Sequence, residues 1–218
     1  MQKTALIPYA DLPRAHHNRH VLTSTIDVFG AAHWLLAERA PQPGGGVLPF
    51  DALVVSVHPG GNVELTELSA VRARWPHLDR LPDGGFVVAA SRARRYEDAK
   101  QVQVFDVLGC ETSSFSVGDA IEHLLVDEAG HIWVGHFDEN PGVAVHGERV
   151  AFYGGYREER DRLAHGELTE TYVEPTNVDL LTLPNGPAPG RRRAVSRGSR
   201  IYVQAEPFTA WGVFDLSS

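Results

Sequence analysis

Short apolar runs separated by turn residues fill most of this chain. The runs are rich in Val, Ile, Leu, Phe, Trp and Tyr, and Gly, Pro and Asp stand between them. Such runs bounded by turn residues are typical of β-strands. The clearest predicted strands cover residues 52–58, 63–68, 86–90, 101–107, 132–137, 149–153, 201–205 and 211–216. No window longer than about three turns has the period of an amphipathic helix, so the pattern predicts an all-β protein.

One unit recurs along the chain. It consists of an apolar strand, a turn with Asp or Gly, and a second strand that carries aromatic residues. Tight turns need positive φ, which Asp-Gly and Gly-Gly supply. The copies, from clearest to weakest, are Leu124–Gly135, Leu78–Val88, Val143–Phe152, Ala194–Tyr202 and Ile26–Leu36. A third-strand signature also repeats, as Val104–Asp106 and Val213–Asp215. The chain is therefore predicted to be built from repeated sheet units.

The best copy carries a family resemblance. Its segment Asp127–Gly135, DEAGHIWVG, resembles the D-x-x-G-x-I-W-V-G turn of bacterial β-propellers, such as two-component-regulator and streptogramin-lyase-like propellers. The resemblance implies four-stranded antiparallel blades, of which propellers usually have about four to eight. We therefore expect residues 1–218 to form one propeller-like domain of about four to five blades, with residues 1–20 as an N-terminal arm. The motif specifies a blade and no activity.

The spacing of the turn glycines is irregular. Gly30 and Gly84 are 54 residues apart, Gly84 and Gly130 are 46 apart, and Gly147 and Gly198 are 51 apart, but Gly130 and Gly147 are only 17 apart. Units of about 40–50 residues suit a blade, so the blade at residues 120–155 is incomplete. Either strands have been lost between residues 138 and 143, or the predicted strands at 143–146 and 149–153 complete the blade that begins at residue 120. We favour the first explanation, because residues 143–152 resemble a blade start.

Unpaired strand edges invite association. An incomplete blade is therefore expected to favour a homo-oligomer. The predicted strand Thr4–Tyr9 offers another way to cover an edge, by pairing with the C-terminal strands to close the ring.

Composition excludes several classes of partner. The net charge is −8 and the sequence pI is about 5.7, so neither nucleic acid nor a membrane surface is an expected partner. Cys110 is the single cysteine, which excludes an intrachain disulfide. No signal-peptide pattern and no apolar stretch of membrane-spanning length is present. We expect a cytoplasmic protein, and the sequence indicates no cofactor.

Histidines and acidic residues give the candidate chemistry. His16, His17 and His20 offer three imidazoles within five residues and are the candidates for a metal site. A polar loop before the first strand is the competing interpretation. His136 with Glu139 is the catalytic pair to test first, because the resemblance to streptogramin-lyase-like propellers implies a histidine that works with acidic residues and a metal. Asp127 fits better as a turn-forming residue.

Arginine forks can hold phosphate or carboxylate groups. Arg191, Arg192 and Arg193 are therefore candidates for binding an anionic ligand, although a solvated strand start is the favoured interpretation of the run. No catalytic motif is present. The sequence thus favours a non-enzymatic module that binds a protein or a small-molecule ligand. The alternatives are a metal-assisted lyase or hydrolase with its site at a central channel, and a fragment completed by a second copy.

Overall fold

The computed structural model describes residues 7–39, 48–92, 100–136, 150–153, 192–205 and 207–215. Within these residues the chain is all-β, as predicted, apart from one short 3-10 helix, η1 (Arg14–His16). No helix in this part of the chain has the length and apolar character that crossing a membrane requires.

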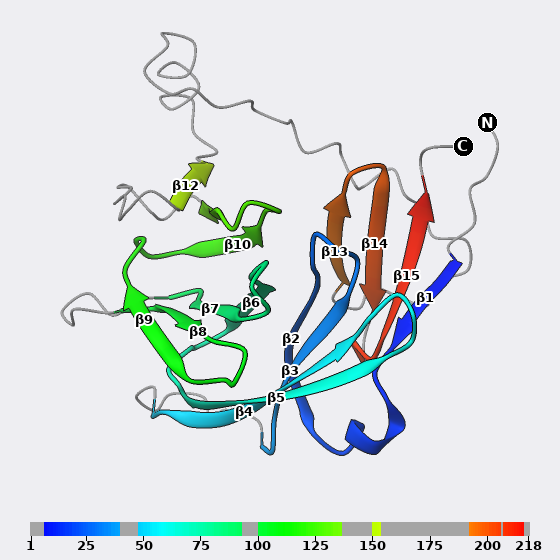
Figure 1. Cartoon of the computed structure of the whole chain (residues 1–218), viewed down its shortest axis with the longest axis horizontal. Helices are drawn as coiled ribbons and strands as arrows, with labels where there is room; N and C mark the ends of the chain where they lie inside the picture. The colour runs from blue at the N-terminus through cyan, green and yellow to red at the C-terminus, as the bar shows by residue number, and fades with distance from the viewer. Residues whose placement is uncertain are drawn as a thin grey trace, which may run out of the picture.

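The strands form four sheets, which follow one another along the chain (Figure 1). The first sheet contains β2 (His20–Ile26), β3 (Ala32–Ala37), β4 (Phe50–Val57) and β5 (Val63–Val71). The second contains β6 (Pro76–Arg80), β7 (Phe86–Ala90), β8 (Val102–Phe105) and β9 (Glu111–Phe115). The third contains β10 (Ile121–Val126), β11 (Ile132–His136) and β12 (Val150–Tyr153). The fourth contains β13 (Arg192–Arg197), β14 (Arg200–Ala205), β15 (Ala210–Asp215) and β1 (Ile7–Asp11).

Four of the five predicted copies of the recurring unit coincide with hairpins, namely β2–β3, β6–β7, β10–β11 and β13–β14, whereas most of the copy Val143–Phe152 lies outside the described residues. The turns at Gly30, Gly84, Gly130 and Gly198 join the two strands of these hairpins. The repeated third-strand signature falls on β8 and β15, and each of these strands pairs with the second strand of the hairpin that precedes it.

Aspartate side chains build several of these turns. Asp127 Oδ1 accepts hydrogen bonds from the backbone N–H groups of Ala129 (3.0 Å) and His131 (2.9 Å). Asp27 uses Oδ1 in the same way on Phe29 and Ala31. A carboxylate that satisfies two N–H groups favours the tight turn locally. The prediction that Asp127 forms a turn is therefore confirmed.

The short glycine spacing has a different origin from the one that we favoured. β12 pairs with β11, from Ile132 opposite Val150 to Gly135 opposite Tyr153, so it belongs to the third sheet. The explanation in which residues 143–152 begin a new blade is therefore wrong for residues 150–153. The pairing is parallel, whereas the completed blade required antiparallel strands. The other predicted strand of that explanation, residues 143–146, lies outside the described residues.

Strands from both ends of the chain complete the fourth sheet. β1 pairs antiparallel with β15, with Ile7 opposite Val213 and Asp11 opposite Ala210. The predicted pairing of the N-terminal strand with a C-terminal strand is confirmed for Ile7–Tyr9, and residues 4–6 of the predicted strand lie outside the described residues.

Three clusters of buried apolar side chains hold neighbouring sheets together. Trp34 of the first sheet packs with Trp211 of the fourth, Leu68 of the first with Phe86 of the second, and Val87 of the second with Val134 of the third. The strands β7 and β3 are buried along their whole length because a sheet lies against each of their faces. This explains why Phe86–Ala90 is a continuous apolar run.

The strands that begin the four hairpins, β2, β6, β10 and β13, all end near one side chain. Arg197, the last residue of β13, contacts the last residues of β2 and β10, Ile26 and Val126, and the penultimate residue of β6, Asp79. We call the side of the molecule where these strands end the Arg197 end, and the side where they begin the opposite end.

Candidate functional site

A buried ion pair lies at the Arg197 end. Arg197 Nη2 donates to Asp79 Oδ2 at 2.8 Å, and its Nε donates to the Ile26 carbonyl at 2.9 Å. Nη1 lies 3.4 Å from the carbonyl oxygen of Val126. The Asp79 side chain is fully buried and that of Arg197 is 12% exposed. One guanidinium thus joins a strand of the fourth sheet to strands of the other three.

Asp79 has further partners that make its burial tolerable. Its Oδ2 also accepts the Val126 N–H (2.6 Å), and its Oδ1 accepts the Arg80 N–H (2.9 Å). Complete burial raises the pKa of Asp79, and Arg197 with the two backbone amides opposes that shift. A buried carboxylate with these partners is a structural joint between sheets and has no free lone pair directed at solvent.

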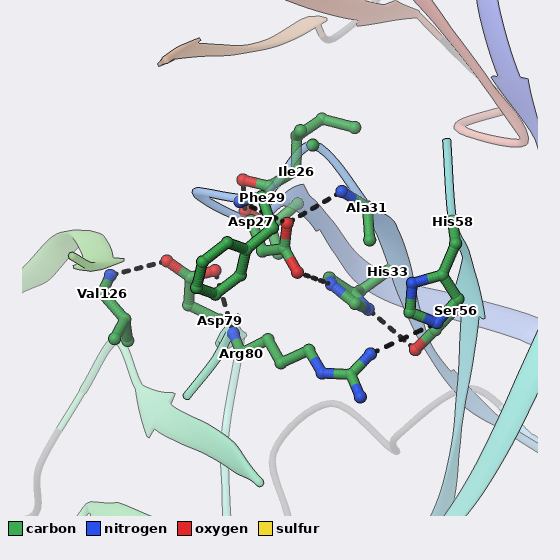
Figure 2. Close-up of polar contacts among 12 residues, drawn as sticks. Ile26, Asp27, Phe29, Ala31, His33, Ser56, His58, Asp79, Arg80 and Val126 are labelled. Carbon is green, nitrogen blue, oxygen red and sulfur yellow. Dashed lines mark hydrogen bonds and ion pairs between the residues drawn. The ribbon is translucent and has the colours of Figure 1, made fainter. Parts of the chain in front are cut away.

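A second buried network of hydrogen-bonded side chains contains the residue types of a hydrolase triad (Figure 2). We call Asp27, His33 and Ser56 the His33 network. His33 Nε2 lies 2.9 Å from Asp27 Oδ2, and His33 Nδ1 lies 2.8 Å from Ser56 Oγ. When His33 donates its Nε2–H to the Asp27 carboxylate, its Nδ1 accepts the hydrogen bond from the Ser56 hydroxyl. Each polar side-chain atom in the His33 network then has a partner. Burial alone would raise the pKa of Asp27, but His33 and the backbone amides outweigh it and the pKa lies below its usual value.

Because its three side chains are buried, the His33 network cannot act as a catalytic triad in this structure. The exposed fractions are 0% for His33, 0% for Ser56 and 1% for Asp27, and a nucleophile must reach its substrate. The His33 ring also packs edge-on against Phe86, with ring centroids 5.6 Å apart. The His33 network therefore fixes the β2–β3 turn to β4, and the ring contact with Phe86 fixes it to the second sheet.

A group of ion-paired side chains lies beside the His33 network and nearer to solvent. Arg80 Nη2 donates to Glu64 Oε2 at 3.0 Å, and His58 Nε2 lies 3.2 Å from the same oxygen. Burial would raise the pKa of Glu64, and Arg80 and His58 lower it further than burial raises it. Arg80 Nη1 also lies 3.5 Å from His58 Nε2 (Figure 2), so the group connects the β4–β5 turn to the second sheet.

Half-buried polar side chains gather at the opposite end of the second and third sheets. His77 Nε2 lies 2.8 Å from Ser91 Oγ and 3.1 Å from the Ile121 carbonyl oxygen. His136 Nδ1 lies 2.8 Å from the Asp119 carbonyl oxygen. A carbonyl oxygen can only accept, so His77 carries a hydrogen on Nε2 and His136 carries one on Nδ1. We call His77, Ser91, Arg92, Asp119 and His136 the polar cluster.

An ion pair completes the polar cluster. Arg92 Nη1 lies 3.5 Å from Asp119 Oδ2, and the two side chains are 35% and 41% exposed. Backbone bonds hold the same segments together, because the Ile121 N–H donates to the Ser91 carbonyl at 3.0 Å. The polar cluster thus brings groups from β6, β11 and two connections to one partly exposed place.

Backbone conformation separates the two ends of the molecule. In the described part of the chain, the non-glycine residues with positive φ are Ala70 (55°), Trp75 (51°), Ala120 (63°) and Phe208 (62°). All lie at the opposite end: near the end of β5, before β6, before β10 and in the β14–β15 connection. The positive-φ residues at the Arg197 end are glycines, at positions 30, 61, 84, 109, 130 and 198, and one further positive-φ glycine, Gly118, lies at the opposite end in the β9–β10 connection. Such non-glycine conformations cost energy and cluster at functional sites.

The structure places the sequence-predicted residues at separate positions. His136 belongs to the polar cluster, and its partner Glu139 lies outside the described residues, so their pairing stays a prediction. Arg191 also lies outside them. Arg192 and Arg193 are the first residues of β13, whose start is at the opposite end.

The N-terminal histidines are distributed over η1 and the start of β2. His16 ends η1, His20 begins β2, and His17 Nε2 contacts the Leu12 carbonyl oxygen at 2.8 Å. Among the described residues, no group of three or more His, Cys, Asp or Glu side chains has the placement that holds a metal ion.

Sequence reasoning missed the two buried networks and most of the polar cluster. Asp79 and Arg197 are 118 residues apart, and His33 and Ser56 are 23 apart, so no local pattern marks them. The Asp27 turn was visible as a copy of the Asp127 turn, and that was the single available signal.

No protein-family model matches the chain, and no curated protein sequence matches it.

Proposed function

We propose that this chain is a β-propeller-like scaffold that works as a non-enzymatic binding module, with its binding surface at the end opposite Arg197. The contrast between the two ends is the observation that carries the proposal. At the Arg197 end, the Arg197–Asp79 ion pair and the His33 network are buried and bonded, the Arg80–Glu64–His58 group is partly exposed, and the positive-φ turn residues are glycines. The opposite end carries strained non-glycine backbone and the half-exposed polar cluster.

Two features support the propeller-like arrangement. The strands β2, β6, β10 and β13, one from each sheet, end at Arg197, as the inner strands of propeller blades lie around a common axis. The fourth sheet combines strands from both ends of the chain. In this arrangement the four sheets are the blades, and the third sheet is the incomplete one. Connections at one end of a propeller supply binding residues from several blades, and function depends on those residues.

A thermal-shift screen against a chemically diverse set of soluble metabolites tests the binding function. We expect at least one compound to raise the melting temperature of the wild-type protein. The shift should disappear in Arg92→Ala, which alters the polar cluster. It should remain in Leu108→Ser, which changes a 78% exposed side chain in the β8–β9 turn at the Arg197 end. No stabilising compound, or equal shifts in all three proteins, would overturn the proposal.

One observation favours the metal-assisted lyase or hydrolase as the second candidate. A metal-ligating histidine usually donates its other ring N–H to a carbonyl or carboxylate, and His136 donates Nδ1–H to the Asp119 carbonyl. Elemental analysis of the purified protein, before and after EDTA treatment, separates the candidates. Stoichiometric metal that is lost in His136→Ala would favour the metal-assisted enzyme, whereas the absence of metal would favour the binding module.

A further inference from the structure

We infer that the ligand of this module is a carbohydrate, with one sugar ring stacked on Trp75 at the edge of the polar cluster. The inference rests on the proposed function and names the chemical class that the opposite end recognises. Trp75 lies in the β5–β6 connection, directly before β6, and is 58% exposed. A large aromatic side chain in solvent beside half-buried polar groups is the first element of the site.

The backbone holds Trp75 in a conformation that a bulky residue rarely adopts. Its φ is 51°, which is a genuine outlier for such a residue. The Ser91 N–H is shared between the Arg74 and Trp75 carbonyl oxygens, at 3.2 Å each. Ser91 belongs to the polar cluster, so the strained segment and the polar cluster are fixed to each other. The backbone of Trp75 is thus fixed to Ser91, a member of the polar cluster.

The surroundings of the Trp75 ring select among ligand classes. The Arg74 guanidinium carbon lies 4.2 Å from the ring centroid, so an arginine already occupies one face of the indole. Its positive charge disfavours a cationic ligand on that ring, and the net charge of −8 disfavours a polyanion. A pyranose ring fits because it is neutral and presents a C–H face to an aromatic surface.

The polar cluster supplies the groups that sugar hydroxyls need. Arg92 and Asp119 are planar, charged and 35% and 41% exposed, so they can each form two hydrogen bonds with neighbouring hydroxyls. Ser91 Oγ and His77 Nε2 lie 2.8 Å apart, and Ser91 is joined to Trp75 through the backbone. Hydrogen bonds to such groups give orientation and specificity, while the aromatic face supplies apolar contact.

The test is binding of a defined panel of mono- to tetrasaccharides, measured on a glycan array and then by isothermal titration calorimetry. We expect at least one saccharide to bind wild type and to bind Trp75→Ala at least about tenfold more weakly. Trp75→Phe, which keeps an aromatic face, should retain part of the affinity. The matched control is Phe29→Ala, because Phe29 is 56% exposed and lies in the β2–β3 turn at the Arg197 end. It should leave the dissociation constant unchanged.

Three outcomes overturn the inference. They are no saccharide binding, binding that Trp75→Ala does not weaken, and a ligand from the metabolite screen that is planar and aromatic and depends on Trp75. In the third case the binding function stands and the carbohydrate class falls. Trp75→Gly relieves the positive φ, so a folded Trp75→Gly protein serves as the second variant if Trp75→Ala does not fold.

Discussion

Replacing Arg197 with methionine tests whether one guanidinium holds the four sheets together. The change removes three contacts, to Asp79 Oδ2 at 2.8 Å, to the Ile26 carbonyl at 2.9 Å and to the Val126 carbonyl at 3.4 Å. It leaves the Asp79 carboxylate fully buried with two backbone N–H partners. Removing one partner of a buried ion pair costs about 3–5 kcal/mol, a large part of the roughly 5–15 kcal/mol that stabilises a typical domain.

Urea denaturation followed by tryptophan fluorescence measures this loss. Trp34 and Trp211 are 0% and 2% exposed, so unfolding changes their surroundings. The matched control is Arg72→Met, because Arg72 pairs with Glu111 at 2.7 Å in a setting that is 37% and 26% exposed. A pair at that exposure contributes less than about 1 kcal/mol.

A double-mutant cycle identifies the cause of the loss. Asp79→Asn removes the buried charge, so the double variant Asp79→Asn with Arg197→Met should be more stable than the sum of the single losses implies, by about 0.5–3 kcal/mol. If Arg197→Met costs no more than Arg72→Met, the guanidinium does not join the sheets, and our interpretation of the Arg197 end is wrong.

Three further predictions follow from other contacts. Because the pKa of Asp27 is lowered in the folded protein, the stabilisation by its carboxylate is complete above the unfolded pKa of about 3.9 and is lost as the pH falls through the folded pKa. The free energies of unfolding of wild type and Asp27→Asn should therefore converge at low pH, and a constant difference between them would contradict this. Gly109→Ala places a Cβ 1.8 Å from the Glu67 carbonyl oxygen, whereas Gly61→Ala meets nothing within 4 Å at a similar φ, so calorimetry should show a much larger drop in melting temperature for the first variant, and equal drops would refute the close approach. Deleting residues 1–12 removes β1 and should lower the melting temperature sharply, and an unchanged melting curve would show that the pairing with β15 adds no stability.

The sequence predicted the strands that are apolar on both faces or strictly alternating. Phe86–Ala90 was predicted to the residue, because a strand buried between two sheets is a continuous apolar run between turn signals. β9 was not predicted, since Glu111–Phe115 is largely polar and mostly exposed at the edge of its sheet. Outer strands are specified by pairing with their neighbour and by the preceding turn, and neither leaves an apolar pattern.

The candidate site was less accessible to sequence reasoning. His136 was singled out, but the Asp119 carbonyl that orients its ring is a backbone group 17 residues away. Trp75 drew no attention because its positive φ and exposure are properties of the folded connection. Contacts between sheets depend on the placement of whole units, and one chain's local pattern does not encode that placement.

The pairing of β1 with β15 also sets the order in which this protein can fold during translation. Ile7 and Val213 are opposite each other, so β1 can pair only after residues 210–215 have been synthesised. Contacts between residues so far apart raise the contact order, and proteins with many such contacts fold slowly. Until β15 emerges, the first strand has no partner and its edge is open to other chains. The pairing that completes the fourth sheet thus also determines how long this edge stays uncovered during synthesis.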